Sequence, residues 1–175
     1  GAVVQFTWPG VPSIYYGEEL GMEGGADPQN RRAMRWDLAK AQNSTLACYR
    51  QLISLRTQLP ILAAGTPEAL PSNDSKSVAA YARRLGSDLA AVALNRSEDR
   101  VEHSLPLGKS NAGKSFIEAF SRKSYTADSN GTVRVALGPM QAALMLPATP
   151  AHLAIVRGSA APTSTQEPNL NGEPS

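Results

Sequence analysis

Side chains that could do chemistry gather in one stretch of the chain, GVPSIYYGEELGMEGGADPQNRRAMRWD, residues 10–37. Turn-forming glycines, two adjacent tyrosines, two adjacent glutamates and an Asp-Pro-x-Asn-Arg-Arg run occur together there, a composition typical of a site. Glu18 and Glu19 suggest a pair of catalytic carboxylates. Adjacent residues at the end of a strand point to opposite sides, however, which argues against such a pair. The kind of site must therefore be inferred from the elements around this stretch.

A second motif, GKSNAGKS at residues 108–115, fits the phosphate-binding pattern of Gly108, Gly113, Lys114 and Ser115. That motif requires a buried strand before it and a long helix after it, because the helix N-terminus supplies part of the anion site. Upstream lie polar residues and Pro106, and the apolar run downstream ends at Phe120. We therefore predict a surface loop between two strands and no nucleotide site.

Composition excludes several other classes of function. The 17 basic and 15 acidic residues nearly cancel, which gives no argument for nucleic acid or a membrane surface as partner. Cys48 is the single cysteine and lies in a helical pattern, so we expect a packing residue rather than a nucleophile. His103 and His152 are too few for a histidine-based zinc site, and we expect no cofactor.

Residues 1–62 carry helix and loop signals. Residues 2–8 could be the end of a helix or a strand, Ser13–Tyr16 predicts a short buried strand, and residues 17–42 predict a long loop. A helix is expected over 44–59, with Asn43 or Ser44 as its N-cap and Pro60 as its stop. Its predicted core-facing stripe contains Leu46, Tyr49, Ile53 and Leu59.

Residues 63–150 carry short strand signals separated by turns, which predict an antiparallel β-sandwich. The expected strands are 77–84, 88–95, 100–107, 115–120, 132–137 and 141–146, with a hairpin turn at 85–87. Residues 158–175 lack large apolar side chains except Leu170, and residues 151–175 are expected to form a flexible tail.

The long motif in the N-terminal part resembles the α-amylase family of glycoside hydrolases, family 13, and within it the cyclomaltodextrinase, neopullulanase and maltogenic-amylase group. The resemblance rests on the motifs PGVP (9–12), IYYGEE (14–19), GM (21–22), DPQNRR (27–32) and M-x-WD (34–37), and it extends to about residue 147. It implies the last strand and helix of a (β/α)8 TIM barrel in residues 1–62, followed by the β-sandwich. Ala33 departs from the Pro that this group often has.

The same resemblance implies that the catalytic carboxylates of the retaining mechanism belong to earlier barrel strands, so no catalytic residue is expected in this chain. Asp27 and Arg31 match positions that line the donor side of the sugar cleft, and they are the predicted substrate-binding residues. An alternative is that the two side chains only pair with each other and stiffen the loop. The implied substrate is an α-glucan or maltooligosaccharide, and the implied partner is the remainder of the barrel.

The other side chains of this stretch are expected to be structural. Glu18 matches an acidic position that makes hydrogen bonds, and Arg32 is expected in a loop-anchoring ion pair. Tyr15, Tyr16 and Trp36 are expected to pack, and the alternative for these three is to stack on a sugar. The family often binds calcium, but no cluster of oxygen ligands here suggests a metal site. A non-catalytic carbohydrate-binding or structural β module remains the alternative function, and localisation is not predicted.

Overall fold

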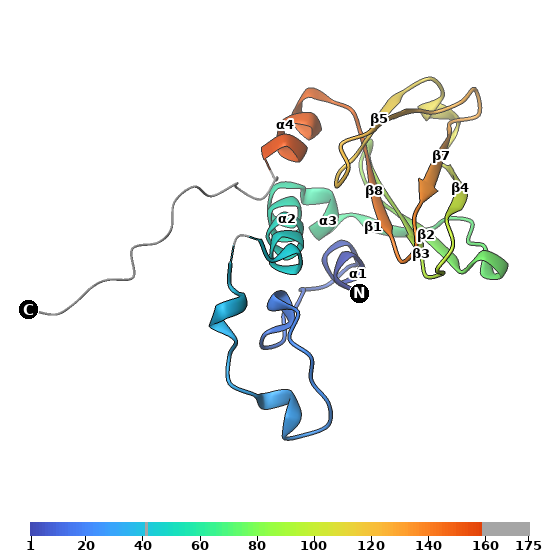
Figure 1. Ribbon diagram of the computed structural model, residues 1–175. Helices are drawn as coiled ribbons and strands as arrows, with labels where there is room; N and C mark the ends of the chain where they lie inside the picture. Colours follow the sequence, from blue (N-terminus) through green and yellow to red (C-terminus); the bar gives the residue numbers. More distant parts are fainter. Residues whose placement is uncertain (41, 159–175) are drawn as a thin grey trace, which may run out of the picture. The chain divides into compact units, whose positions relative to one another are not determined.

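The computed structural model describes residues 1–40 and 42–158, and these divide into two compact units. The first unit contains residues 1–13 and 52–158, and the second contains residues 14–51. Figure 1 labels the helices and the longer strands along the chain.

The described residues form four α-helices and eight strands: α1 (Ala2–Thr7), α2 (Ser44–Gln58), α3 (Pro60–Ala64), β1 (Thr66–Ala69), β2 (Val78–Leu85), β3 (Asp88–Asn95), β4 (Val101–Pro106), β5 (Ser115–Glu118), β6 (Ser124–Thr126), β7 (Thr132–Leu137), β8 (Ala142–Pro147) and α4 (Pro150–Gly158). Five short 3-10 helices lie between them, at Glu18–Leu20, Gln29–Arg31, Trp36–Leu38, Asp74–Lys76 and Lys109–Asn111.

The strands form two antiparallel sheets. The larger sheet has the order β1-β2-β3-β8-β5-β6, and β4 pairs with β7 in the smaller one. The hairpin between β2 and β3 closes at the pair Leu85↔Asp88, so Gly86 and Ser87 form a two-residue turn, and Gly86 takes the positive φ of 59° that this turn needs at its first position. All six predicted strands are present, and the expected antiparallel β domain is confirmed. The structure adds β1 and β6, which the sequence pattern missed.

Both faces of the larger sheet are buried. Alternate residues of β3 belong to two different cores: Leu89, Ala91 and Ala93 face one, and Ala90 and Val92 face the other. The smaller sheet supplies Leu105, Val133 and Val135 to the first core. Helical residues, among them Leu59 and Val156, supply the second. We refer to these as the sheet core and the helix core.

This arrangement explains a difference between the strand sequences. β3 reads as a nearly continuous apolar run and is buried along its length, whereas β7 alternates between buried and exposed residues. A strand covered on both faces needs apolar residues at successive positions, while a strand with one solvated face alternates. The first unit is therefore a sandwich with a third layer, made of helices, on the outer face of its larger sheet.

Helix α2 begins as the sequence predicts. Asn43 is its N-cap, because the Asn43 side-chain oxygen accepts a hydrogen bond of 3.0 Å from the amide of Leu46. Pro60 does more than end this helix, since it occupies the first turn of α3. The predicted stripe is partly wrong: Ile53 is 39% exposed, while Leu52 and Leu55 are buried.

Three other predictions concern Ser13–Tyr16, the C-terminal segment and residues 108–115. Ser13–Tyr16 forms no strand, because a strand needs a hydrogen-bonded neighbour and none pairs with it in the described chain. The expected flexible tail starts too early, since Pro150–Gly158 is helical and buries His152 and Val156; the rest of that tail lies outside the described residues. Residues 108–115 lie between β4 and β5, which belong to different antiparallel sheets, and no long helix follows them in the described chain. The phosphate-loop geometry, which needs that helix, is therefore excluded, as predicted.

The expected domain boundary between residues 62 and 63, which separates the barrel part from the β-sandwich, stays a prediction. The helix core crosses that position, since Leu59, Ile61 and Leu62 pack with Val92 and Leu144. Helices in the described part of the chain are all too short or too polar to span a membrane.

Candidate functional site

The second unit is built around the turn at Gly17. This residue has a φ of 77°, and a Cβ atom there would collide with the side chain of Met22. The amides of Leu20 and Met22 both donate to the carbonyl of Gly17, at 3.1 and 3.0 Å. Glycine at this position therefore lets the chain reverse tightly while Met22 folds back over it.

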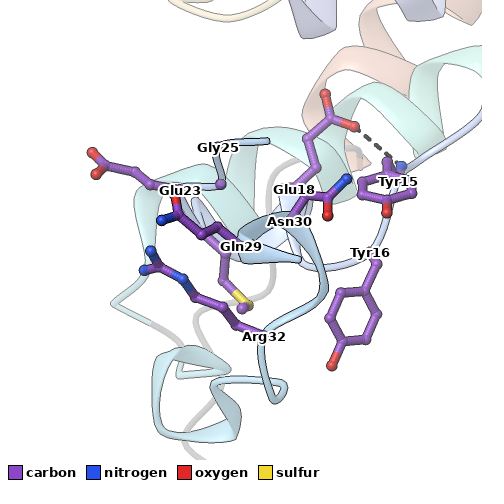
Figure 2. A pocket seen from close by; sticks show the side chains of 10 residues that line it. Tyr15, Tyr16, Glu18, Glu23, Gly25, Gln29, Asn30 and Arg32 are labelled. Atoms are coloured by element: carbon purple, nitrogen blue, oxygen red, sulfur yellow. Dashed lines mark hydrogen bonds between the residues drawn. The ribbon is translucent and has the colours of Figure 1, made fainter. Parts of the chain in front are cut away.

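Glu18 has the hydrogen-bonding role that the resemblance implied. Its carboxylate accepts a hydrogen bond of 3.2 Å from the amide of Tyr15, which Figure 2 shows. Burial raises the pKa of the Tyr49 hydroxyl to about 12, and the hydrogen bond and negative charge of Glu18 add to this effect. Glu18 thus links the turn to α2 through the buried Tyr49.

A hollow of about 240 Å³ opens beside this turn. Figure 2 shows the side chains that line it. Its lining includes aromatic, acidic, amide and basic side chains, with glycines at the rim: Tyr15, Tyr16, Glu18, Met22, Glu23, Gly24, Gly25, Gln29, Asn30 and Arg32. Sequence reasoning did not single out Gln29, Asn30 or Glu23. The available signal was the pair Gly24-Gly25, because Gly24 lies close to the backbone of Asn30.

The side chain of Asn30, which lines this hollow, has a buried acceptor without a donor in the described chain. Its side-chain oxygen is buried and has no donor among the described residues. A buried acceptor without a donor costs about 1–3 kcal/mol, so a donor from a ligand or from further polypeptide would stabilise the site.

Asp27 and Arg31 are close in sequence to residues that line this hollow, but their own side chains do not line it. They form a two-pronged ion pair with each other: Nε and Nη2 of Arg31 donate to the two oxygens of Asp27 at 2.7 and 2.8 Å. Both side chains remain largely exposed, at 60% for Asp27 and 67% for Arg31. The short 3-10 helix Gln29–Arg31 brings the two residues onto one side, four positions apart.

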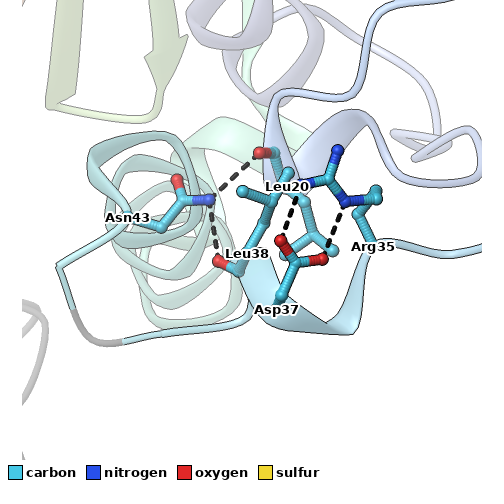
Figure 3. A network of polar contacts seen from close by, with 5 residues as sticks. All are labelled: Leu20, Arg35, Asp37, Leu38 and Asn43. Carbon is cyan, nitrogen blue, oxygen red and sulfur yellow. Dashed lines mark hydrogen bonds and ion pairs between the residues drawn. The ribbon is translucent and has the colours of Figure 1, made fainter.

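A second ion pair and the side-chain amide of Asn43 hold the other end of this loop, as Figure 3 shows. Arg35 pairs with Asp37 through contacts of 2.7 and 2.6 Å, and this lowers the pKa of the Asp37 carboxyl. The side-chain amide of Asn43 donates to the carbonyls of Leu20 and Leu38, at 3.0 and 2.9 Å. Asn43 therefore joins two distant loop segments to the start of α2.

Several packing expectations for this loop are wrong for the described chain. Tyr15, Tyr16 and Trp36 are 57%, 45% and 74% exposed, because no neighbouring strand or helix covers them. No ion pair of the described residues includes Arg32, which instead lines the hollow. Cys48 is half-buried and unpaired, and burial raises the pKa of its thiol. Among the described residues, no group of three or more metal-ligating side chains is present.

Comparison with known proteins agrees with the motif and the β domain. The profile of the maltogenic amylase C-terminal domain matches residues 68–144. A cyclomaltodextrinase of Geobacillus thermopakistaniensis is 33% identical over 135 residues, which are 77% of this chain and 22% of that protein. An amylopullulanase of Thermoanaerobacter thermohydrosulfuricus is 32% identical over 164 residues, covering 87% of this chain and 11% of that protein.

This chain belongs to the α-amylase family of glycoside hydrolases. Its structure is similar to that of an Anoxybacillus α-amylase, with a TM-score of 0.72 and 26% identity over 84% of this chain and 31% of the other. The chain thus spans about a fifth or less of the curated relatives named above and about a third of this solved α-amylase. As an α-amylase family member, it has the antiparallel C-terminal β domain of that family in its first unit.

Proposed function

We propose that this chain is the C-terminal part of an α-glucan-active retaining glycosidase or transglycosidase. In this proposal, residues 1–62 complete a (β/α)8 barrel, and Ser13–Tyr16 becomes its last strand when a neighbouring strand pairs with it. The exposure of Tyr15 and Tyr16 supports this, because these side chains would gain cover from the missing barrel. The catalytic carboxylates would be supplied by the preceding strands.

The Asp27–Arg31 pair is the observation that carries the substrate assignment. Arg31 uses two of the roughly five N–H groups of a guanidinium on Asp27, and the carboxylate keeps further lone pairs free. The pair therefore presents fixed donors and acceptors side by side while its charges cancel. Such a pair suits an uncharged ligand with neighbouring hydroxyl groups, which describes a glucan. The ion pair and sugar contact are thus compatible roles rather than alternatives.

The test is made in the enzyme encoded by the complete reading frame that contains this chain. Asp27→Ala is expected to lower kcat/KM on maltooligosaccharides about tenfold to a hundredfold, because a charge-assisted hydrogen bond contributes about 1.5–3 kcal/mol. Its thermal stability should change little, since an exposed ion pair contributes about 0–1 kcal/mol. The 175-residue chain alone should release no reducing sugar from maltodextrin.

Arg35→Ala is the matched control, because Arg35 and Asp37 form an equally exposed, two-pronged pair in the same loop. If loop stiffening were the only role of such pairs, both variants would lose activity to the same extent. Equal losses, or an unchanged kcat/KM for Asp27→Ala, would refute the substrate role.

The match of the C-terminal domain profile to residues 68–144 alone favours one other candidate, a non-catalytic β module. The reading frame that contains this chain, and the activity of the protein it encodes, distinguish the enzyme from the non-catalytic module. A frame that starts immediately before Gly1, with no strands bearing acidic residues ahead of it, would replace the enzyme proposal by the module.

A further inference from the structure

The end of α1 is an unusual meeting point in the first unit. The last carbonyls of any α-helix lack intrahelical donors and carry partial negative charge. At α1 these carbonyls are bound by two arginines that come from distant parts of the chain, Arg56 of α2 and Arg83 of β2. Both arginines thus bind carbonyls of residues 6–10.

Arg56 binds the chain that leaves α1. Its Nη1 donates to the carbonyls of Phe6 and Trp8 at 3.0 and 2.9 Å, and its Nη2 donates to the carbonyl of Gly10. Burial lowers the pKa of this guanidinium. A single side chain therefore holds three carbonyls across the turn Trp8–Gly10.

Arg83 binds the same helix end from the β domain. Its side chain is fully buried, and it donates to the carbonyls of Thr7, Leu62 and Gly65. Burial lowers the pKa of Arg83, and the nearby positive charge of Arg56 adds to this effect. No ion pair of the described residues includes either guanidinium, and the hydrogen bonds of both go to backbone carbonyls.

The two arginines have different consequences for the chain. Arg83 joins α1 and α3 to β2, all within the first unit. Arg56 joins two segments that flank residues 14–51: Gly10 lies four positions before that unit begins, and Arg56 lies five positions after it ends. Between Gly10 and Ile14, Val11 is 95% exposed, and the side-chain amide of Gln5 adds one further hydrogen bond, to the carbonyl of Ser13. Arg56 therefore closes the base of the segment that carries the candidate site.

We propose that Arg56 is a positioning residue for that site: it holds the chain entering residues 14–51 against the helix by which the chain leaves them. The inference rests on the proposed function for its effect on substrate, but its structural part can be tested separately. Without Arg56, the carbonyls of Trp8 and Gly10 lose their donor, and the entering chain gains freedom of movement.

The structural test uses the 175-residue chain in a Trp36→Phe background, which leaves Trp8 as its single tryptophan. Trp8 packs edge-to-face on Tyr81, with ring centroids 4.9 Å apart, and its carbonyl is one of those that Arg56 binds. Arg56→Met is expected to lower the nanosecond fluorescence anisotropy of Trp8. Arg56→Lys should give an intermediate loss, because an ammonium group has donors but lacks the planar fork.

Arg50→Met is the control, since Arg50 lies on the same helix and is exposed. Unchanged anisotropy of Trp8 in both Arg56 variants, or an equal loss in Arg50→Met, would overturn the inference. If Arg56→Met does not fold, the Arg56→Lys comparison decides.

The functional test uses the complete enzyme. Arg56→Met should raise KM for maltooligosaccharides about tenfold and change kcat little, because misplaced binding residues weaken substrate binding. If Trp8 loosens and KM stays constant while Asp27→Ala raises it, the positioning role is refuted and the proposed function stands. If Asp27→Ala itself has no effect, the proposed function fails, while the anisotropy of Trp8 still decides whether Arg56 holds the entering chain.

Discussion

Tyr49 and Glu18 illustrate how single side chains hold the loop of the candidate site. The Tyr49 ring is 5% exposed and lies on α2, while Glu18 follows the glycine turn. A buried phenol favours its neutral form, and a neighbouring carboxylate favours it further, since the ionised phenolate would be repelled. The pair therefore depends on Tyr49 keeping its proton.

This dependence predicts a loss of stability at high pH. The folded pKa of Tyr49 is about 12, against an ordinary value of 10.0, so the unfolded chain releases this proton first. The contribution to stability is complete below pH 10 and disappears as the pH rises from about 10 to 12. Urea unfolding at several pH values measures it, and Tyr49→Phe should remove this part of the pH dependence. An identical decline in both proteins would contradict the assignment.

Gly131 and Gly113 allow two effects of glycine to be separated. Both have positive φ, 76° and 70°. A Cβ atom on Gly131 would overlap the carbonyl of Gly108, whereas a Cβ atom on Gly113 would meet open space. Only the first position therefore combines backbone strain with a collision against main-chain atoms.

Alanine substitutions at these two glycines should differ in cost. Gly113→Ala is expected to lower the free energy of unfolding by about 1–2 kcal/mol, the cost of a left-handed conformation for a residue with a Cβ. Gly131→Ala should cost clearly more, because the backbone at Gly108, in the loop after β4, must also shift. Thermal or urea unfolding of the two variants gives the comparison, and equal losses would show that the collision relaxes freely.

Among the elements, α2 contributes to both units, and Asn43 is its N-cap. The oxygen of the Asn43 side chain caps the helix, and its amide nitrogen donates to Leu20 and Leu38. The same residue thus starts the helix and closes the loop before it.

Two substitutions at Asn43 separate these roles. Asn43→Ala removes both, and we expect a loss of about 2–3 kcal/mol from the cap and the two hydrogen bonds. Asn43→Ser keeps a capping oxygen but cannot donate to two carbonyls, so it should recover about 1 kcal/mol. Hydrogen exchange of the first turn of α2 and urea unfolding provide the measurements. Equal stability of the two variants would mean that the cap contributes nothing.

At the level of the molecule, the larger sheet is the element on which the first unit is assembled. Its sheet core is closed by β4 and β7, and its helix core is closed by helical segments before and after the β strands in sequence. Leu55, Leu59, Ile61 and Leu62 are each buried almost completely in the helix core. A β domain cut at residue 62 would lose all four.

We therefore expect residues 52–158 to form a more stable fragment than residues 63–158. Full burial of each such side chain contributes about 1.5–3 kcal/mol, and their loss exposes one face of the sheet. The shorter fragment should bind the dye ANS and melt at a lower temperature. Equal melting temperatures and no dye binding would instead support an independent β domain that begins at residue 63.

Local signals in the chain were sufficient for α2, its cap at Asn43, six of the strands and the hairpin turn at Gly86. Each depends on side-chain periodicity, capping or turn chemistry within a few residues, which is why one sequence reveals it. The loop motif likewise indicated the family, because many side chains of specific type occur there at specific spacing. The weak elements β1, β6 and α4 were missed because β1 and β6 span only four and three residues, and α4 lies in a segment that looked like a tail.

Long-range contacts decided the remaining features. Arg83 is a charged residue on a strand, yet it is buried, and helix ends 18 to 76 positions away supply carbonyls to it. Tyr15, Tyr16 and Trp36 read as packing residues, yet they are exposed because burial requires a neighbour that the described chain does not provide. Burial, ion pairing and the covering of both sheet faces depend on which distant segments meet, and no local pattern of residues encodes that meeting.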